Sequence, residues 1–219
     1  MRRERPVLAL IMALIAVALG IVILFQNPEN PERGMVFGGH EWRILYMDYG
    51  NNAALIITEN IIETRPFHHR WTSMTWEESD IRQYLNTEFL KTFTEYERER
   101  ILPTNVINED NPWFHTPGGS DTLDYIFLLS IREAEDLFYD MPDRIAIYSP
   151  AASWWQFWNR NGAPLRWWLR SPGMFGFAAY VGDNGFVRLG GGNVDGSHPH
   201  DYRGGDGFGL RPALWIRME

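Results

Sequence analysis

Residues 167–173, Trp-Trp-Leu-Arg-Ser-Pro-Gly, and residues 209–216, Gly-Leu-Arg-Pro-Ala-Leu-Trp-Ile, decide the fold of this chain. Both stretches have the composition of buried, tightly specified backbone. The segment between them, residues 174–208, has the opposite character: it is rich in polar residues and contains ten glycines in 35 positions. Glycine supplies no side chain for packing and loses much conformational entropy on folding. The sequence therefore predicts a rigid frame that presents polar loops, which is the usual setting of a binding site.

An apolar segment near the N-terminus predicts a membrane anchor. Residues 7–25 contain no charged side chain, and these 19 residues span roughly 28 Å as a helix, close to the thickness of the hydrocarbon core. Three arginines lie within residues 1–6, so the positive-inside rule places that end in the cytoplasm and the rest of the chain outside the membrane. A cleaved signal peptide is the alternative, because Ala-Val-Ala at 16–18 resembles a cleavage site. The length of the apolar run favours an uncleaved, single-pass anchor.

The remainder divides into a short linker at residues 26–34 and one domain at residues 35–219. The domain contains 16 Lys and Arg against 25 Asp and Glu once the charges of the first 34 positions are set aside. This acidic excess argues against nucleic acid as a partner. The chain has no cysteine, which excludes disulfide bonds, thiol catalysis and thiolate metal ligands.

We expect an α+β domain with mostly antiparallel sheets. Residues 42–48 and 53–58 have the pattern of a hairpin, and a later hairpin is expected to turn through Asn184 and Gly185, both at positive φ. Two Ser/Thr-x-x-Glu capping boxes, one at residues 75–78 and one at 130–133, mark the starts of the two main helices. The predicted helices cover residues 76–90, 94–101 and 130–139, and the other strands are expected at 124–129, 178–181, 186–189 and 210–216.

Several motifs in a fixed order resemble a widespread bacterial domain family of unknown function. They are the sequences at residues 40–45, 54–57, 75–86, 127–130, 167–173, 179–181 and 209–216. This family is similar in fold to C-type-lectin-like domains of the formylglycine-generating-enzyme branch. The resemblance implies a C-type-lectin-like fold in which the first and last strands pair, so that Trp42 and Trp215 lie in one sheet.

The branch that the chain resembles contains enzymes as well as binding proteins, so the fold alone does not decide the function. Formylglycine formation uses active-site cysteines, which this chain lacks. Related iron-dependent sulfoxide synthases use a histidine–carboxylate facial triad, which scattered residues would have to build here. The resemblance extends to variable proteins of diversity-generating retroelements, which carry a hypervariable ligand-binding segment near the C-terminus. The mixture of polar residues and glycine at residues 193–207 is compatible with that role.

His198, His200 and Asp201 form the most metal-like group of the sequence, with Asp195 nearby. Two imidazoles and a carboxylate could hold a divalent ion. Pro199 and the glycine-rich flanks, however, give no periodicity that would preorganise the ligands. The favoured interpretation is a solvated loop with neither a metal nor another cofactor.

Other side chains that could carry chemistry have a structural interpretation. His68 and His69 are adjacent in sequence, and adjacent residues point apart on a strand or a helix, so a shared ligand role is not expected. Arg170 and Arg211 are expected to pair internally, because the guanidinium fork suits buried acceptors. The tryptophans at residues 167–168 are expected to be structural, as part of the frame.

Our sequence-based hypothesis is a membrane-anchored, extracytoplasmic domain of receptor or adhesion type that binds a protein or a glycan through loops of residues 174–208. Aromatic residues would supply contact area and polar residues hydrogen bonds, as in antibody loops. The tryptophan cluster at 154–158 could stack on the ligand or belong to the core. The alternatives are a metal-dependent oxidase or hydrolase built on the 198–201 group and a purely structural envelope module. The expected binding residues are Trp154, Trp155, Trp158, Phe175, Phe177, Asn193, Asp195, His198, His200, Asp201, Tyr202, Arg203 and Asp206.

Overall fold

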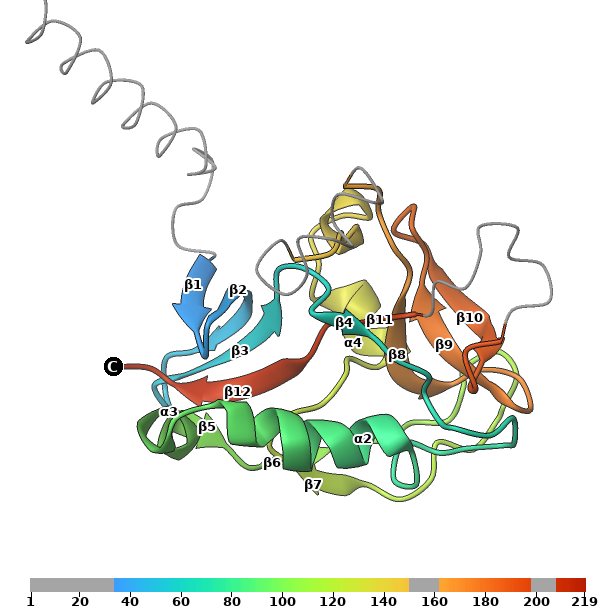
Figure 1. Cartoon of the computed structure of the whole chain (residues 1–219), viewed down its shortest axis with the longest axis horizontal. Helices are drawn as coiled ribbons and strands as arrows, with labels where there is room; N and C mark the ends of the chain where they lie inside the picture. Colours follow the sequence, from blue (N-terminus) through green and yellow to red (C-terminus); the bar gives the residue numbers. More distant parts are fainter. Residues whose placement is uncertain (1–33, 150–161, 198–207) are drawn as a thin grey trace, which may run out of the picture. The chain divides into compact units, whose positions relative to one another are not determined.

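The computed structural model describes residues 34–149, 162–197 and 208–219. The predicted anchor at 7–25, the tryptophans at 154–158 and the residues from 198 to 206 lie outside this part of the chain. The residues from Gly34 to Glu219 form one compact unit, an α+β domain whose sheets are mostly antiparallel (Figure 1). No helix in the described residues is long and apolar enough to cross a membrane.

The first sheet contains the strands near both ends of the domain. Its order is β1-β2-β3-β12-β5, and β3 is buried along its whole length between β2 and β12. The expected hairpin of β2 and β3 is confirmed. Trp42 and Trp215 share this sheet, but the first strands do not pair with β12, because the apolar β3 takes the place between them. The bounds are β1 Gly34–Phe37, β2 His40–Asp48, β3 Ala53–Thr58, β5 Ile101–Leu102 and β12 Ala213–Arg217.

The second sheet carries the frame sequence at 167–173 and has the order β10-β9-β8-β11-β4. Every residue of β8 is buried. The hairpin of β9 and β10 is confirmed, but of its two expected turn residues only Gly185 has positive φ, at 80°. The bounds are β4 Glu63–Thr64, β8 Trp167–Pro172, β9 Phe177–Val181, β10 Val187–Asn193 and β11 Gly209–Leu210. A third, two-stranded sheet pairs β6 Thr104–Val106 with β7 Thr122–Asp124.

The helices are shorter than the sequence predicts. The first main helix begins after Ser79, whose Oγ accepts a hydrogen bond from Arg82 N, and not after Thr75, whose hydroxyl binds the Glu78 side chain instead. The capping boxes of α3 and α4, at Thr94 and Ser130, have both of their reciprocal hydrogen bonds. The bounds are α2 Asp80–Tyr84, continued by a π-turn at Leu85–Phe89 and a 3₁₀ turn at Leu90–Thr92, then α3 Glu95–Arg100, α4 Ile131–Asp136 and a 3₁₀ turn at Pro142–Arg144.

The apolar run at 124–129 is not the predicted strand. Asp124 is the last residue of β7 and pairs with Thr104, and after it only Phe127 forms a ladder bridge in this run, with Ala213. The two backbone N–H groups before Phe127 donate to a side chain: Asn86 Oδ1 accepts from Tyr125 N at 2.8 Å and from Ile126 N at 3.2 Å. The run is buried apart from Tyr125, which is 42% exposed, and a side chain instead of a neighbouring strand satisfies part of its backbone.

The core gathers the large aromatic residues around two buried arginines. Trp167 and Trp168 have no exposed surface, and the ring of Trp168 stacks on Phe208 at a centroid distance of 3.7 Å. Arg211 is fully buried and donates to the carbonyl oxygens of Thr58, Glu59 and Arg144. Burial lowers the pKa of Arg211 to about 9, against the opposing effect of the Glu59 carboxylate, so the guanidinium is still charged at neutral pH. The expected internal pairing of this arginine is confirmed.

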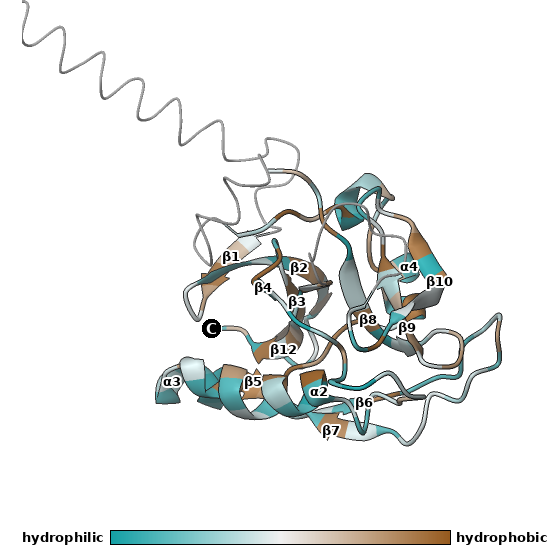
Figure 2. Cartoon of the chain, turned by 45° about the vertical axis from the view of Figure 1, so that its right-hand side comes forward, coloured by the Kyte–Doolittle hydropathy of each residue, from teal (hydrophilic) through white to brown (hydrophobic). Residues whose placement is uncertain are grey.

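The segment 174–208 is less loop-like than its composition suggests. The segment contains β9 and β10. Most of the residues between its start and Asn193 lie in these two paired strands. Ala179, Val181, Val194 and Phe208 are buried in the core, so these positions belong to the frame. Figure 2 shows hydrophobic and hydrophilic colours together along β10. In the described part of this segment, the exposed residues lie in the turns, apart from Arg188 of β10.

Candidate binding surface

A long connection between β6 and β7 forms an ordered loop around one buried amide. Asn111 is fully buried, and its Nδ2 donates to Pro172 O of β8 at 2.7 Å and to Leu189 O of β10 at 2.9 Å. Its Oδ1 accepts from the backbone N–H groups of Trp113 and Phe114, both at 2.9 Å. All four hydrogen-bonding positions of this amide are thus used. The loop is fixed on the edge of the second sheet.

The ordered loop holds two aromatic side chains in solvent. Trp113 is 72% exposed and Phe114 is 40% exposed. The β8–β9 turn lies beside Phe114, because a Cβ added at Gly190 would come within 3.6 Å of the Phe114 ring and 3.8 Å of Met174 Cε. Met174 and Phe175, in this turn, are 42% and 70% exposed.

A third segment joins the same surface from the connection that precedes α2. Trp71 is 57% exposed, and its indole covers Gly176, whose added Cβ would come within 2.7 Å of Trp71 Nε1. An added Cβ at Gly119 would likewise meet Thr75 at 2.9 Å. These close approaches place three connections side by side, as Figure 1 shows beside the second sheet. We call the resulting set of side chains the aromatic surface: Trp71, Trp113, Phe114, Met174 and Phe175.

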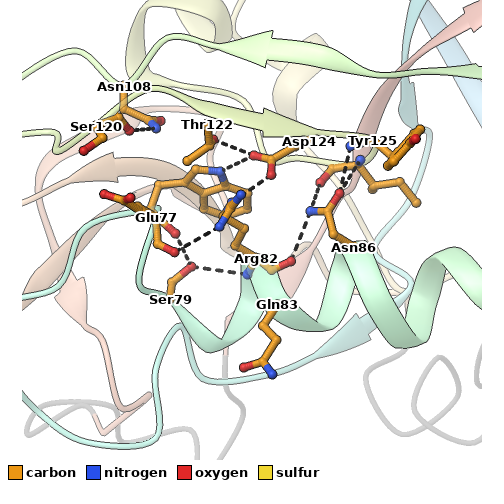
Figure 3. Close-up of polar contacts among 12 residues, drawn as sticks. Glu77, Ser79, Arg82, Gln83, Asn86, Asn108, Ser120, Thr122, Asp124 and Tyr125 are labelled. Atoms are coloured by element: carbon orange, nitrogen blue, oxygen red, sulfur yellow. Dashed lines mark hydrogen bonds and ion pairs between the residues drawn. The ribbon is translucent and has the colours of Figure 1, made fainter.

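The helix α2 that follows Trp71 is held by a buried carboxylate. Asp124 accepts from Trp76 Nε1 at 2.8 Å, from Thr122 Oγ1 at 2.7 Å and from Arg82 Nε at 2.7 Å (Figure 3). Its side chain has no exposed surface, so breaking this set would leave a buried charge unpaired. The network ties α2 to β7 and thereby fixes the segment that carries Trp71.

Two adjacent histidines and an aspartate lie at the start of α2. Asp80 Oδ2 is 2.7 Å from His69 Nδ1 and accepts from His69 N at 2.8 Å, and Asp80 Oδ1 is 3.1 Å from His68 Nδ1. The expectation that the two rings point apart is wrong. It assumed a strand or a helix, whereas residues 67–72 form a bend in which both rings lie on one side, with centroids 4.3 Å apart.

The carboxyl group of this cluster is ionised at neutral pH. Partial burial raises the pKa of Asp80, but the hydrogen bonds from His69 and the charges of both histidines lower it by more, so that the pKa lies below its ordinary value of 3.8. The cluster therefore offers one negative charge and two imidazole rings.

The structure also places Arg170 as expected, in internal pairs. Its guanidinium forms a bidentate ion pair with Glu133 of α4 and donates to Leu128 O and Ile107 O. A pocket of about 260 Å³ lies over this pair and is lined by polar side chains of α4 together with Ile107, Glu109 and Leu137. Because Ile107 begins the ordered loop, Arg170 links the frame sequence to the base of the loop that carries Trp113.

The sequence-predicted binding residues are only partly brought together. Phe175 lies in the aromatic surface, whereas Phe177 is half-buried in β9. Asn193 and Asp195 close the turn after β10, since Asn193 Nδ2 and Asp195 Oδ1 both bind the Ser197 side chain. The remaining predicted residues lie outside the described part of the chain: Trp154, Trp155, Trp158, His198, His200, Asp201, Tyr202, Arg203 and Asp206.

Sequence reasoning missed three of the aromatic residues. The signal available for two of them was the Asn-Pro-Trp-Phe sequence at 111–114, in which a turn-forming dipeptide precedes two large aromatic residues. Trp71 follows two histidines and an arginine in a polar connection, where an aromatic residue has no local core to join.

The domain is an α+β module with mostly antiparallel sheets. The chain belongs to the family described as "Domain of unknown function (DUF6273)", whose model matches residues 51–218. The expected membership of a domain family of unknown function is thereby confirmed. No curated protein and no solved structure matches the chain.

Proposed function

We propose that this protein is a binding module that recognises a protein ligand through the aromatic surface. The observation that carries the proposal is the exposure of five large apolar side chains on three ordered, neighbouring connections. Single exposed apolar residues are normal, but contiguous exposed patches mark interaction sites. A partner that buries these side chains would remove their apolar surface from water, and the complex would gain a hydrophobic free energy that the free domain lacks.

The loops are already ordered in the free domain, which supports binding, because folding and not association bears the conformational entropy cost of ordering them. The four hydrogen bonds of Asn111 hold Trp113 and Phe114 in place before a ligand arrives. A preorganised surface loses less conformational entropy on association. Connections of this length without regular structure are uncommon in compact domains unless they have a function.

The composition of the surface favours a protein over a glycan. Trp, Phe and Met are enriched in the cores of protein–protein interfaces, and tryptophan in particular supplies much of their binding energy. Met174 adds an adaptable side chain that can fit an irregular partner. The acidic excess of the domain favours a partner with a basic rim around its apolar contact.

The wider setting is part of the same proposal. The apolar composition of residues 7–25 supports a single-pass anchor that displays the domain outside the membrane. The motif resemblance supports a C-type-lectin-like arrangement of the frame and a diversified binding segment of the retroelement type, both of which would suit a receptor or adhesion role.

Site-specific photo-crosslinking in the native host tests the proposal. A photoreactive amino acid at position 113 or 175 should give one discrete protein adduct, while the same amino acid at Tyr49, which is 85% exposed in the β2–β3 turn, should give none. The adduct identifies the partner for binding measurements with the purified full-length chain.

In those measurements, Trp113→Ala should weaken binding at least tenfold, as expected for a hot-spot tryptophan, and Tyr49→Ala should leave it unchanged. Identical adducts from all three positions, or binding that survives loss of Trp113, would contradict the proposal. Capture of an oligosaccharide by the same surface on a glycan array, with no protein adduct, would favour the glycan class instead.

A further inference from the structure

We propose that His68, His69 and Asp80 bind a divalent transition-metal ion, with three protein ligands and an open position toward solvent. A ring nitrogen of each histidine and a carboxylate oxygen all lie within 4.8 Å of one another. Imidazole nitrogen combined with carboxylate is the ligand chemistry of zinc and its neighbours in the transition series, not of magnesium or calcium. The proposal is independent of the proposed protein-binding function.

The distances within the cluster are close to those that a bound ion requires. Metal–ligand bonds of about 2.0–2.1 Å in a tetrahedral site separate two ligand atoms by roughly 3.3 Å. His69 Nδ1 lies 2.7 Å from Asp80 Oδ2, and His68 Nδ1 lies 3.1 Å from Asp80 Oδ1. Both nitrogens thus already lie next to the carboxylate, and entry of an ion requires the side chains to open slightly.

The buried histidine has a nitrogen available to an ion. His68 Nδ1 is buried and makes no hydrogen bond with any described residue, although Asp80 Oδ1 lies 3.1 Å away. The carboxylate oxygen therefore lies near this nitrogen without occupying its bonding direction. A buried polar atom without a hydrogen bond is costly, and coordination of an ion would satisfy it.

The backbone around all three ligands is preorganised. His68 N donates to Val194 O at 2.8 Å, and Ile81 N donates to Phe67 O at 3.3 Å. Asp80 is the first residue of α2, after the N-cap Ser79. His68 is thus held by the residue that follows β10, and Asp80 by a capped helix, which is the support that a metal site needs.

The burial of the ligands predicts an open site. The side chain of His68 is 11% exposed, whereas those of His69 and Asp80 are 58% and 40% exposed. An ion bound among them would have protein on the His68 side and solvent on the other, where water or another ligand completes the coordination. Three protein ligands with one free position are typical of reactive zinc sites, while structural sites are closed by four.

The test is zinc binding by the purified full-length chain after treatment with a chelator. Isothermal titration with Zn²⁺ alone should show one site per chain, and the same titration with Mg²⁺ or Ca²⁺ should show none. The melting temperature should rise with zinc concentration, since an ion that binds only the folded state stabilises it.

Variants distinguish this cluster from the other histidine group. His69→Gln and Asp80→Asn should each weaken zinc binding by more than about a hundredfold, beyond the effect of losing a supporting residue, and should abolish the zinc-dependent rise in melting temperature. Both side chains are more than one third exposed, so these variants should stay folded, which circular dichroism checks. The matched control replaces His198, His200 and Asp201 together by alanine and should keep zinc affinity unchanged. Absence of zinc binding to the wild-type chain, or its loss in the control and retention in the variants, would overturn the proposal.

Discussion

Trp167 and Trp168 have no exposed surface, whereas Trp71 and Trp113 expose 57% and 72% of theirs. The buried pair lies on β8, between β9 and β11, and both indole N–H groups donate to backbone carbonyl oxygens. The exposed pair lies on connections that hydrogen bonds and glycine contacts hold in place. Tryptophan therefore has two roles in this domain, and the exposed fraction of the side chain distinguishes them.

The difference teaches which contacts maintain the fold and which are available for recognition. A buried tryptophan contributes through the apolar area that folding removes from water. An exposed tryptophan on a rigid connection contributes little to folding and keeps its area for a partner. The two regions should consequently respond to mutation in opposite ways.

The strongest test of this difference is to remove one tryptophan from each region. Trp168→Ala deletes the ring that stacks on Phe208 and the hydrogen bond to Arg65 O. It should lower the free energy of unfolding by about 3–5 kcal/mol, the range for large aromatic residues in cores. Trp113→Ala should change it by no more than about 0.5 kcal/mol. Chemical denaturation measures both, and similar losses for the two variants would contradict the division between frame and surface.

A second test concerns the residue that joins the two regions. Asn111→Ala removes four hydrogen bonds and leaves their partners on β8, β10 and the loop unsatisfied. We expect a loss of about 2 kcal/mol, intermediate between the two tryptophans. Hydrogen exchange at the amides of Trp113 and Phe114 should become at least tenfold faster. The matched control is Asn51→Ala, an exposed turn asparagine, and protection that survives loss of Asn111 would show that the loop is ordered by other contacts.

The frame was predictable from sequence because its signals are local. The apolar runs at 167–173 and 209–216 are buried as expected, and Ser130 caps its helix through a residue three positions away. In contrast, the apolar composition of residues 124–129 predicts a strand that is not there. Composition indicates that a segment is buried, but it does not show which groups its backbone N–H and C=O groups bind. The side chain of Asn86, about 40 positions earlier, supplies that partner.

The candidate surface was poorly predicted because its contacts are distant in sequence. Asn111 binds carbonyl groups that lie 61 and 78 positions away, and no local pattern indicates such pairing. The cluster of His68 and His69 was rejected on the assumption of regular secondary structure, which the bend at these residues does not have. Composition identified the glycine-rich segment as unusual, but it did not show that much of this segment is a paired hairpin.

The smallest expected effect tests whether a partly exposed ion pair belongs to the frame. Glu59 receives two hydrogen bonds from Arg43, at 2.8 Å and 2.5 Å. Burial raises the pKa of Glu59, but the hydrogen bonds and charge of Arg43 lower it by more, so that it lies below its ordinary value of 4.5. The unfolded chain therefore binds more protons as the pH falls, and the stability that the pair provides above about pH 4.5 is lost as the pH falls through the folded-state pKa.

Glu59→Gln should reduce this acid-dependent loss, by less than about 1 kcal/mol because the pair is partly exposed to solvent. The measurement is the free energy of unfolding at pH 6 and at pH 3 for the variant, the wild type and Glu41→Gln, an exposed glutamate on the same sheet. An unchanged difference between the two pH values in the Glu59 variant would show that the pair is incidental. The frame would then depend on its apolar contacts and its buried arginines alone, which would make the contrast with the exposed tryptophans still sharper.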